Sequence, residues 1–198
     1  MKIISICGKA GSGKDYIASN YIIPYIKDVL KCTVVQLSFA DQIKINVMTK
    51  YDISYEDLYE IKTQETRKLL QLEGTELGRN IRGQDIWIKY YNNWIKVLKN
   101  RGVDYIITCD LRFQNEFNYL KGKNSIIIKL VAPERHHDRI LKESNGNMDI
   151  YNQFKNHISE CDLDNTSDDS FDLIINNDSN IHEQDFKTKI DLLYNLIA

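Results

Sequence analysis

The sequence predicts an α/β protein in which helices cover both faces of a mostly parallel β-sheet. Three observations lead to this prediction: a glycine-rich loop follows the first apolar run, further short apolar runs recur along the chain, and helix-length segments separate them. Short, nearly continuous apolar runs are typical of parallel strands that are buried on both faces. Their alternation with helices indicates a three-layer α/β/α fold.

The predicted elements can be assigned in chain order. The strand-like runs lie at residues 1–7, 33–39, 103–109, 125–131 and 171–175. A helix should follow the loop and be kinked or ended by Pro24, because proline lacks the backbone N–H that a helix interior needs. Near the C-terminus, Phe186, Ile190, Leu193 and Ile197 recur at spacings typical of an amphipathic helix that closes over the sheet.

The length of 198 residues predicts one domain with a small mobile insertion. Residues from about 42 to 98 contain no strand-like run, so we expect several helices there, forming an insertion on the substrate side. Residues 142–156 are rich in Asn, Gly and Ser and follow a basic cluster. We therefore expect a small lid at about residues 133–160.

The loop itself is the most specific motif. Residues 8–14 match the phosphate-binding pattern GxxxxGK. Such a loop directs backbone N–H groups at phosphate oxygens, the helix that follows adds partial positive charge, and Lys14 would reach the β- and γ-phosphates. This predicts a P-loop NTPase fold, against the alternative of a glycine-rich turn that binds nothing. The residues expected to bind the nucleotide here are Gly8, Lys9, Ala10, Gly11, Ser12, Gly13, Lys14, Asp15 and Tyr16.

Asp15 stands where Ser or Thr normally follows the loop lysine and binds Mg²⁺. The metal would then be held by this carboxylate or from elsewhere. Asp110 ends a predicted central strand, where ligands gather in open α/β sheets, and it could orient the same ion. Arg112 could clamp a phosphate. The alternative is that Asp110 caps the next helix while Arg112 and Glu116 pair on its surface.

Two further groups could carry chemistry. Arg135 and Arg139 follow a predicted strand and could stabilise charge on a transferring group, or they could belong to a solvated basic helix start. In the helical insertion, Arg79 and Thr75 have phosphate-compatible side chains, and Trp87 offers an aromatic face for a base. Its helical spacing with Trp94 is equally consistent with a packing face.

The composition excludes several function classes. A formal net charge of −2 gives no reason to expect a nucleic-acid groove or an anionic-membrane surface. No apolar run approaches the length that spans a bilayer, and the N-terminus resembles neither a signal nor a transit peptide. The four cysteines lack CxxC spacing and suggest free thiols of a reducing compartment. We expect a cytoplasmic protein, in the host cytoplasm if viral.

Taken together, the motifs resemble the deoxynucleoside monophosphate kinases of bacteriophages and large DNA viruses. The resemblance covers most of the chain and follows the family's order, with Asp15 familiar after the loop lysine. It rests on residues 8–15, 38–44, 70–79, 85–88, 110–116, 157–160 and 171–177.

This resemblance implies transfer of the ATP γ-phosphoryl group to a deoxynucleoside monophosphate, with Mg²⁺ as cofactor. It implies small-molecule nucleotide partners and suggests a homodimer. The acceptor site would be lined by Asp41, Lys44, Gln71, Thr75, Arg79 and Trp87. Asp110 and Arg112 would lie near the reacting phosphates, Arg135 and Arg139 would be lid arginines, and Asn176 would lie beside the adenine.

Two alternatives stay open at this point. One is another small-molecule kinase, similar to phosphomevalonate kinase or dephospho-coenzyme A kinase. The other is a nucleotide-binding module without transfer activity. The base that the acceptor carries does not follow from residue types, because base selection depends on pocket shape.

Overall fold

A computed structural model describes residues 1–61, 63–178 and 180–198 of the chain. The chain divides into two compact units. The first comprises Met1–Gln36 and Val103–Ala198, and the second comprises Leu37–Gly102. The helical insertion expected at about 42–98 falls within the second unit.

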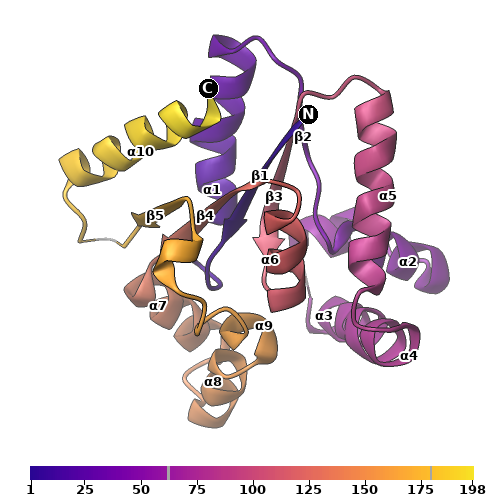
Figure 1. Ribbon diagram of the computed structural model, residues 1–198. Coiled ribbons are helices and arrows are strands. Elements are labelled where there is room, and N and C mark those ends of the chain that lie inside the picture. The colour runs from indigo at the N-terminus through magenta and orange to yellow at the C-terminus, as the bar shows by residue number, and fades with distance from the viewer. Residues whose placement is uncertain (62, 179) are drawn as a thin grey trace. The chain divides into compact units, whose positions relative to one another are not determined.

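The first unit is built on a five-stranded sheet in the order β2-β3-β1-β4-β5 (Figure 1). The strands are β1 (Lys2–Cys7), β2 (Val34–Gln36), β3 (Tyr105–Leu111), β4 (Ile126–Val131) and β5 (Leu173–Asn176). Every pair of neighbouring strands runs parallel, with Ser5 opposite Thr108 on one side of β1 and opposite Ile127 on the other. The parallel α/β sheet predicted from the apolar runs is therefore confirmed.

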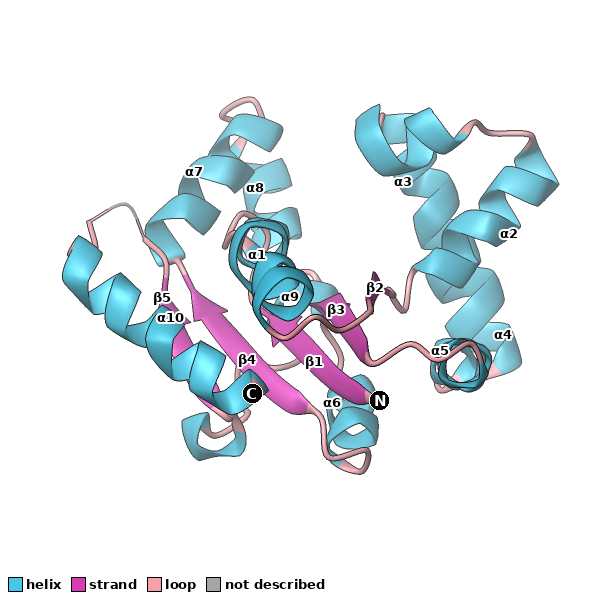
Figure 2. Cartoon of the chain, turned by 90° about the horizontal axis from the view of Figure 1, so that it is seen from above, coloured by secondary structure: helices cyan, strands magenta, loops and turns pink. Residues whose placement is uncertain are grey.

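Helices cover both faces of this sheet (Figure 2). They are α1 (Lys14–Ile17) with the π-helical turns η1 (Ala18–Ile22) and η2 (Tyr25–Val29), then α6 (Gln114–Lys121), α7 (Pro133–Glu143), α8 (Met148–Lys155), α9 (Ile158–Cys161), the 3₁₀ turn η5 (Asp168–Ser170) and α10 (Glu183–Ile197). The α1 segment and α10 pack on one face, where Ile17, Ile22, Ile190 and Leu193 join strand residues in the core. Figure 2 shows α6 on the other face. Its Phe117 meets Phe171 edge to face.

Two expectations were wrong: that the helix ends at Pro24, which was one of two alternatives there, and that a strand spans residues 33–39. Helical turns continue past Pro24 to Val29, since Pro24 keeps helical dihedral angles and precedes η2. The strand expected at residues 33–39 is limited to Val34–Gln36. It ends early because the backbone N–H of Ser38 donates to the Asp41 carboxylate and begins the next helix instead of a sheet ladder.

In its described residues the second unit is helical. It contains α2 (Asp41–Tyr51), η3 (Asp57–Ile61), α3 (Gln64–Gln71), η4 (Leu72–Arg79), α4 (Asn80–Arg82) and α5 (Ile86–Asn100), of which η3 and η4 are π-helical. Its own core includes Val47, Leu58 and Trp87, and Phe39 stacks on Tyr91 at 4.2 Å between ring centroids. Across the described parts of the chain, no helix has the length and apolar character that crossing a membrane requires.

Candidate phosphate-binding site

The phosphate loop connects β1 to α1 and has the backbone that its glycines allow. Gly11 and Gly13 adopt φ values of 84° and 87°, in the left-handed region that other residues rarely enter. A Cβ on Gly13 would come within 2.5 Å of the Asn177 side-chain nitrogen, and one on Gly11 within 3.0 Å of the Arg135 carbonyl oxygen. Both glycines are therefore required by the turn and by close neighbours.

Lys14 lies at the start of α1 and folds back over the loop. Its ammonium donates to the carbonyl oxygens of Gly8 at 2.6 Å and Lys9 at 3.0 Å. The residue is only 8% exposed. The pKa of Lys14 is lowered to about 8, mainly by burial and also by the positive charge of Arg112, while Glu160 and Asp15 act in the opposite direction. A phosphate anion would favour the charged form by supplying a counter-charge.

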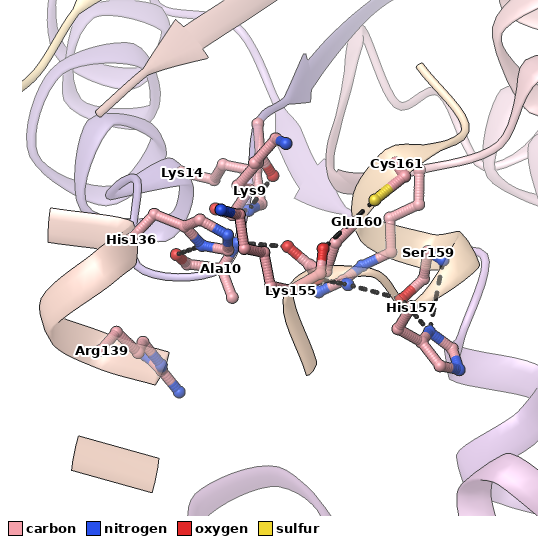
Figure 3. Close-up of polar contacts among 12 residues, drawn as sticks. Lys9, Ala10, Lys14, His136, Arg139, Lys155, His157, Ser159, Glu160 and Cys161 are labelled. Atoms are coloured by element: carbon pink, nitrogen blue, oxygen red, sulfur yellow. Dashed lines mark hydrogen bonds and ion pairs between the residues drawn. The ribbon is translucent and has the colours of Figure 1, made fainter. Parts of the chain in front are cut away.

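The outer side of the loop is held by three side chains from distant parts of the sequence. Asn177 donates its side-chain amide to the carbonyl of Ser12 at 2.8 Å. A ring nitrogen of His136, Nδ1, lies 2.8 Å from the Ala10 carbonyl oxygen, and the Ala10 N–H donates to the Glu160 carboxylate at 2.8 Å (Figure 3). These contacts fix the loop backbone at Ala10 and Ser12.

The predicted charged residues of this unit gather around the loop. Arg112 follows β3 and donates from Nη1 to Glu160 at 2.5 Å. Arg135 donates to the Asn177 carbonyl at 3.1 Å, and its own carbonyl lies against Gly11. Arg139 also packs beside Gly11 through its aliphatic stem, while its guanidinium pairs with Glu143.

The two carboxylates expected at a metal lie in the same region. Asp15 is exposed in the first turn of α1, and Asp110 is the penultimate residue of β3. Burial raises the pKa of the Cys109 thiol to about 12, and the negative charges of Asp15 and Asp110 both add to this shift, which places both carboxylates near that thiol. Among the described residues no cluster of three His, Cys, Asp or Glu side chains could hold an ion alone. Two carboxylates fit Mg²⁺, which takes one or two protein carboxylates together with phosphates and water.

An open cavity of about 410 Å³ lies beside the loop. Tyr16, Tyr21 and Phe186 supply its aromatic surface, and Arg135 and Asn177 line it as well. Asn176, which was expected beside the adenine, is exposed, and its side chain accepts from the Asp178 N–H. The geometry therefore favours Asn177 over Asn176 as the asparagine that lines this cavity.

A second cavity, of about 370 Å³, lies on the side of Arg112 and Glu160. The ends of β1, β3 and β4 form its floor, and the segment of residues 160–171 covers it. Its walls are largely apolar, with Leu111, Leu130 and Phe171 among them. The cations along its edge are paired: Lys9 with Asp164 at 2.9 Å and Lys129 with Asp168 at 2.7 Å.

The remaining predicted residues belong to the second unit. Asp41 accepts from the Ser38 N–H and from the Tyr59 hydroxyl, and burial raises the pKa of that Tyr59 hydroxyl. The ammonium of Lys44 lies 3.8 Å from the Asp41 carboxylate and 3.8 Å from the centre of the Tyr59 ring. Asp41 and Lys44 are thus brought together, with Tyr59 as a partner that the sequence analysis missed.

The other predicted residues lie in or next to the π-helical turn η4: Thr75 and Arg79 belong to it, Gln71 precedes it, and Trp87 packs on it from α5. Gln71 is exposed and Thr75 half-buried, whereas Arg79 is 9% exposed and donates to the Gln84 carbonyl. Trp87 is 1% exposed, donates to the Gly74 carbonyl at 2.7 Å and packs directly on Gly78. The structure favours the packing alternative for Trp87, because its ring face is covered by protein.

Comparison with known proteins supports the fold and the resemblance. No family model matches the chain. The crystal structure of TT1252 from Thermus thermophilus superposes with a TM-score of 0.55 at 14% identity, over 99% of this chain and 96% of that one, which shows a shared fold. Shikimate kinase from Acinetobacter baumannii in complex with shikimate matches at a TM-score of 0.45 and 11% identity, over 100% of this chain and 93% of that one.

In sequence, the chain matches a protein of Acanthamoeba polyphaga mimivirus that is provisionally named a deoxynucleotide monophosphate kinase. The two are 29% identical over 153 residues, which is 67% of this chain and 75% of the mimivirus protein. The resemblance is confirmed.

Sequence reasoning missed all three side chains that hold the loop, Asn177, Glu160 and His136. Asn176 was expected beside the adenine instead of Asn177. Both residues follow the last apolar run, and the alternation of side chains along a strand could direct either of them to that place. Glu160 was noted only within the stretch His157 to Glu160, and nothing in that stretch signals its contact with a loop about 150 residues away. Only the folded chain reveals that contact.

Proposed function

We propose that the protein is an ATP-dependent kinase that transfers the γ-phosphoryl group to the 5′-phosphate of a deoxynucleoside monophosphate. The observation that carries this proposal is the phosphate loop with Lys14 and the guanidinium of Arg112 beside it in one unit. The acceptor class comes from the name of the mimivirus relative.

On the donor side, ATP would place its phosphates in the loop and its base in the aromatic cavity. The inner N–H groups of the loop and Lys14 suit a triphosphate. Tyr16 and Phe186 offer apolar surface for a purine, and Asn177 offers an amide at the same place. The cavity and the loop therefore lie close enough together to take the base and the phosphates of one nucleotide.

The chemistry requires placement and charge neutralisation more than acid–base catalysis. An acceptor phosphate oxygen is already a nucleophile at neutral pH, so no side chain has to remove a proton from it. Lys14 and Arg112 would neutralise charge on the two polyanions, with Arg135 and Arg139 from α7 as further cations. Asp15 and Asp110 would hold Mg²⁺, which when bound neutralises phosphate charge.

On the acceptor side, we assign Asp41, Lys44, Gln71, Thr75 and Arg79 to the nucleoside monophosphate. Lys44 and Arg79 supply positive charge, and Thr75 and Gln71 supply hydrogen-bonding groups. Trp87 would act by supporting the segment from Gly74 to Gly78, on which Thr75 lies.

A coupled assay of ADP release tests the proposal. Purified protein is given ATP, Mg²⁺ and one acceptor at a time: dTMP, dGMP, dCMP, dAMP or dUMP. We expect turnover with at least one nucleotide, and none in a Lys14→Met variant that still unfolds cooperatively. Phosphomevalonate and dephospho-coenzyme A serve as competing acceptors.

Two outcomes would contradict the proposal. Turnover with phosphomevalonate or dephospho-coenzyme A alone would indicate another small-molecule kinase. ATP binding without transfer to any acceptor would indicate a nucleotide-binding module.

A further inference from the structure

The carboxylate of Glu160 joins two parts of the site that lie far apart in the sequence. One oxygen, Oε2, accepts from the Ala10 N–H of the phosphate loop at 2.8 Å. The other, Oε1, accepts from Nη1 of Arg112 at 2.5 Å, and the Ser159 hydroxyl lies 3.4 Å from the same nitrogen. The Glu160 side chain is only 10% exposed. Glu160 belongs to the short helix α9, and Figure 3 shows its side chain directed toward Ala10 of the loop.

Only a carboxylate of this length serves both donors. It offers one acceptor oxygen to each of them, whereas a glutamine amide would turn an N–H₂ donor toward one of the two. An aspartate is one methylene shorter and could not keep both contacts without movement of the backbone. The Glu160 carboxylate is also largely buried, and charge-assisted hydrogen bonds of this kind are shorter and stronger than neutral ones.

The contact leaves part of the guanidinium available. A guanidinium has five N–H donors in a rigid fork. Glu160 and Ser159 engage Nη1, and among the described residues no contact engages Nε or Nη2 of Arg112. Arg112 can therefore bind a phosphate through Nε and Nη2 while Nη1 stays bonded to Glu160.

We propose that Glu160 is a positioning residue, which fixes Arg112 relative to the phosphate loop so that the donor and acceptor phosphates are held at a reacting distance. This inference rests on the proposed function. His136 complements Glu160, because it contacts the carbonyl of Ala10 while Glu160 takes the N–H of the same residue. Loop and arginine then form one rigid unit.

The test compares Glu160→Ala and Glu160→Gln with Asp169→Asn, an exposed carboxylate on the same segment. A misplacement of about 1 Å can cost on the order of 10²-fold in rate. We expect kcat to fall by about 10- to 100-fold in both Glu160 variants, with KM for ATP changed by less than about threefold. Asp169→Asn should resemble the wild type.

Tighter binding of pyrophosphate by Glu160→Ala would point to a different role for Glu160. If Glu160 instead occupied the place of a substrate phosphate, Glu160→Ala would bind pyrophosphate more tightly and keep or raise its kcat. That outcome would overturn the inference.

A readout without turnover separates this inference from the proposed function. Hydrogen–deuterium exchange of the peptide covering residues 7–16 should be faster in Glu160→Ala than in wild type, because the Ala10 N–H loses its acceptor. Unchanged exchange would overturn the inference even in an inactive protein. Absence of turnover in the wild type with every acceptor would contradict only the proposed function.

Discussion

The side-chain amide of Asn177 donates to the carbonyl of Ser12 at 2.8 Å, so the residue that follows the last strand of the sheet supports the phosphate loop after the first strand. The next residue, Asp178, accepts from the N–H groups of Glu134 and Arg135 at the start of α7. Two consecutive residues thus connect the loop to the helix that carries the expected lid arginines.

Replacement of Asn177 should therefore matter more than replacement of its neighbour. Asn177→Ala removes the donor to a buried carbonyl, which should lower the free energy of unfolding by about 1–3 kcal/mol and weaken ATP binding. Asn176→Ala, at an exposed position, should change either quantity far less. Denaturant titration and isothermal calorimetry of the two variants check this. Equal effects of the two replacements would show that Asn177 has no special role.

ATP affinity should fall above pH 8. Since the pKa of Lys14 is about 8 without ligand, and bound phosphates favour its charged form, binding takes up a proton in this range. The expected slope approaches about tenfold per pH unit above pH 8 and vanishes below pH 7. Calorimetry in two buffers of different ionisation enthalpy measures the uptake. A Lys14→Arg variant, whose guanidinium stays charged, should show no such proton uptake.

The same pKa shift affects stability. The unfolded chain, with Lys14 near its usual pKa of 10.5, binds more protons than the folded chain between pH 8 and pH 10.5. This group therefore makes the free energy of unfolding rise with pH across that range. Lys14→Met should remove this contribution in denaturant titrations of the unliganded protein. A stability curve with the same shape in both proteins would contradict it.

The two tryptophans allow a direct test of the packing role of Trp87. In a Trp94→Phe variant, the remaining fluorescence comes from a side chain that is 1% exposed. It should be emitted at short wavelength, resist quenching by acrylamide and stay unchanged when nucleotides bind. Trp87→Ala should cost about 3–5 kcal/mol of stability. Strong quenching of Trp87 by a deoxynucleotide would instead support stacking on a base.

Asp15 should influence the metal requirement. Asp15→Asn keeps the size of the side chain and removes its charge, so the Mg²⁺ concentration needed for half-maximal activity should rise several-fold. Asp28→Asn is a matched control, because Asp28 is exposed in the helical turn η2 of the same segment and is not among the proposed site residues. An unchanged Mg²⁺ dependence of Asp15→Asn would remove Asp15 from the metal site.

The sequence predicted well what local patterns determine. Continuous Ile-rich runs predict buried parallel strands, and the glycines of the loop predict its backbone, since few other residues adopt the φ of Gly11 or Gly13. The periodic residues Ile190 and Leu193 predict the buried face of α10.

What escaped prediction depends on contacts between distant segments. Glu160 meets Ala10 and Arg112 only because the chain returns across the carboxyl edge of the sheet. The burial of Trp87 depends on how closely η4 approaches α5 at Gly78, which residue spacing does not encode. The choice between Asn176 and Asn177 depends on which way side chains point at the end of β5, and a single sequence does not fix that register.

The second unit is a single uninterrupted stretch, Leu37–Gly102, whereas the first is assembled from both ends of the chain. Evolution or an engineer could therefore exchange one continuous gene segment and leave untouched the residues that hold the phosphate loop. Under the proposed function, such a replacement would change the acceptor preference and leave the proposed ATP site as it is.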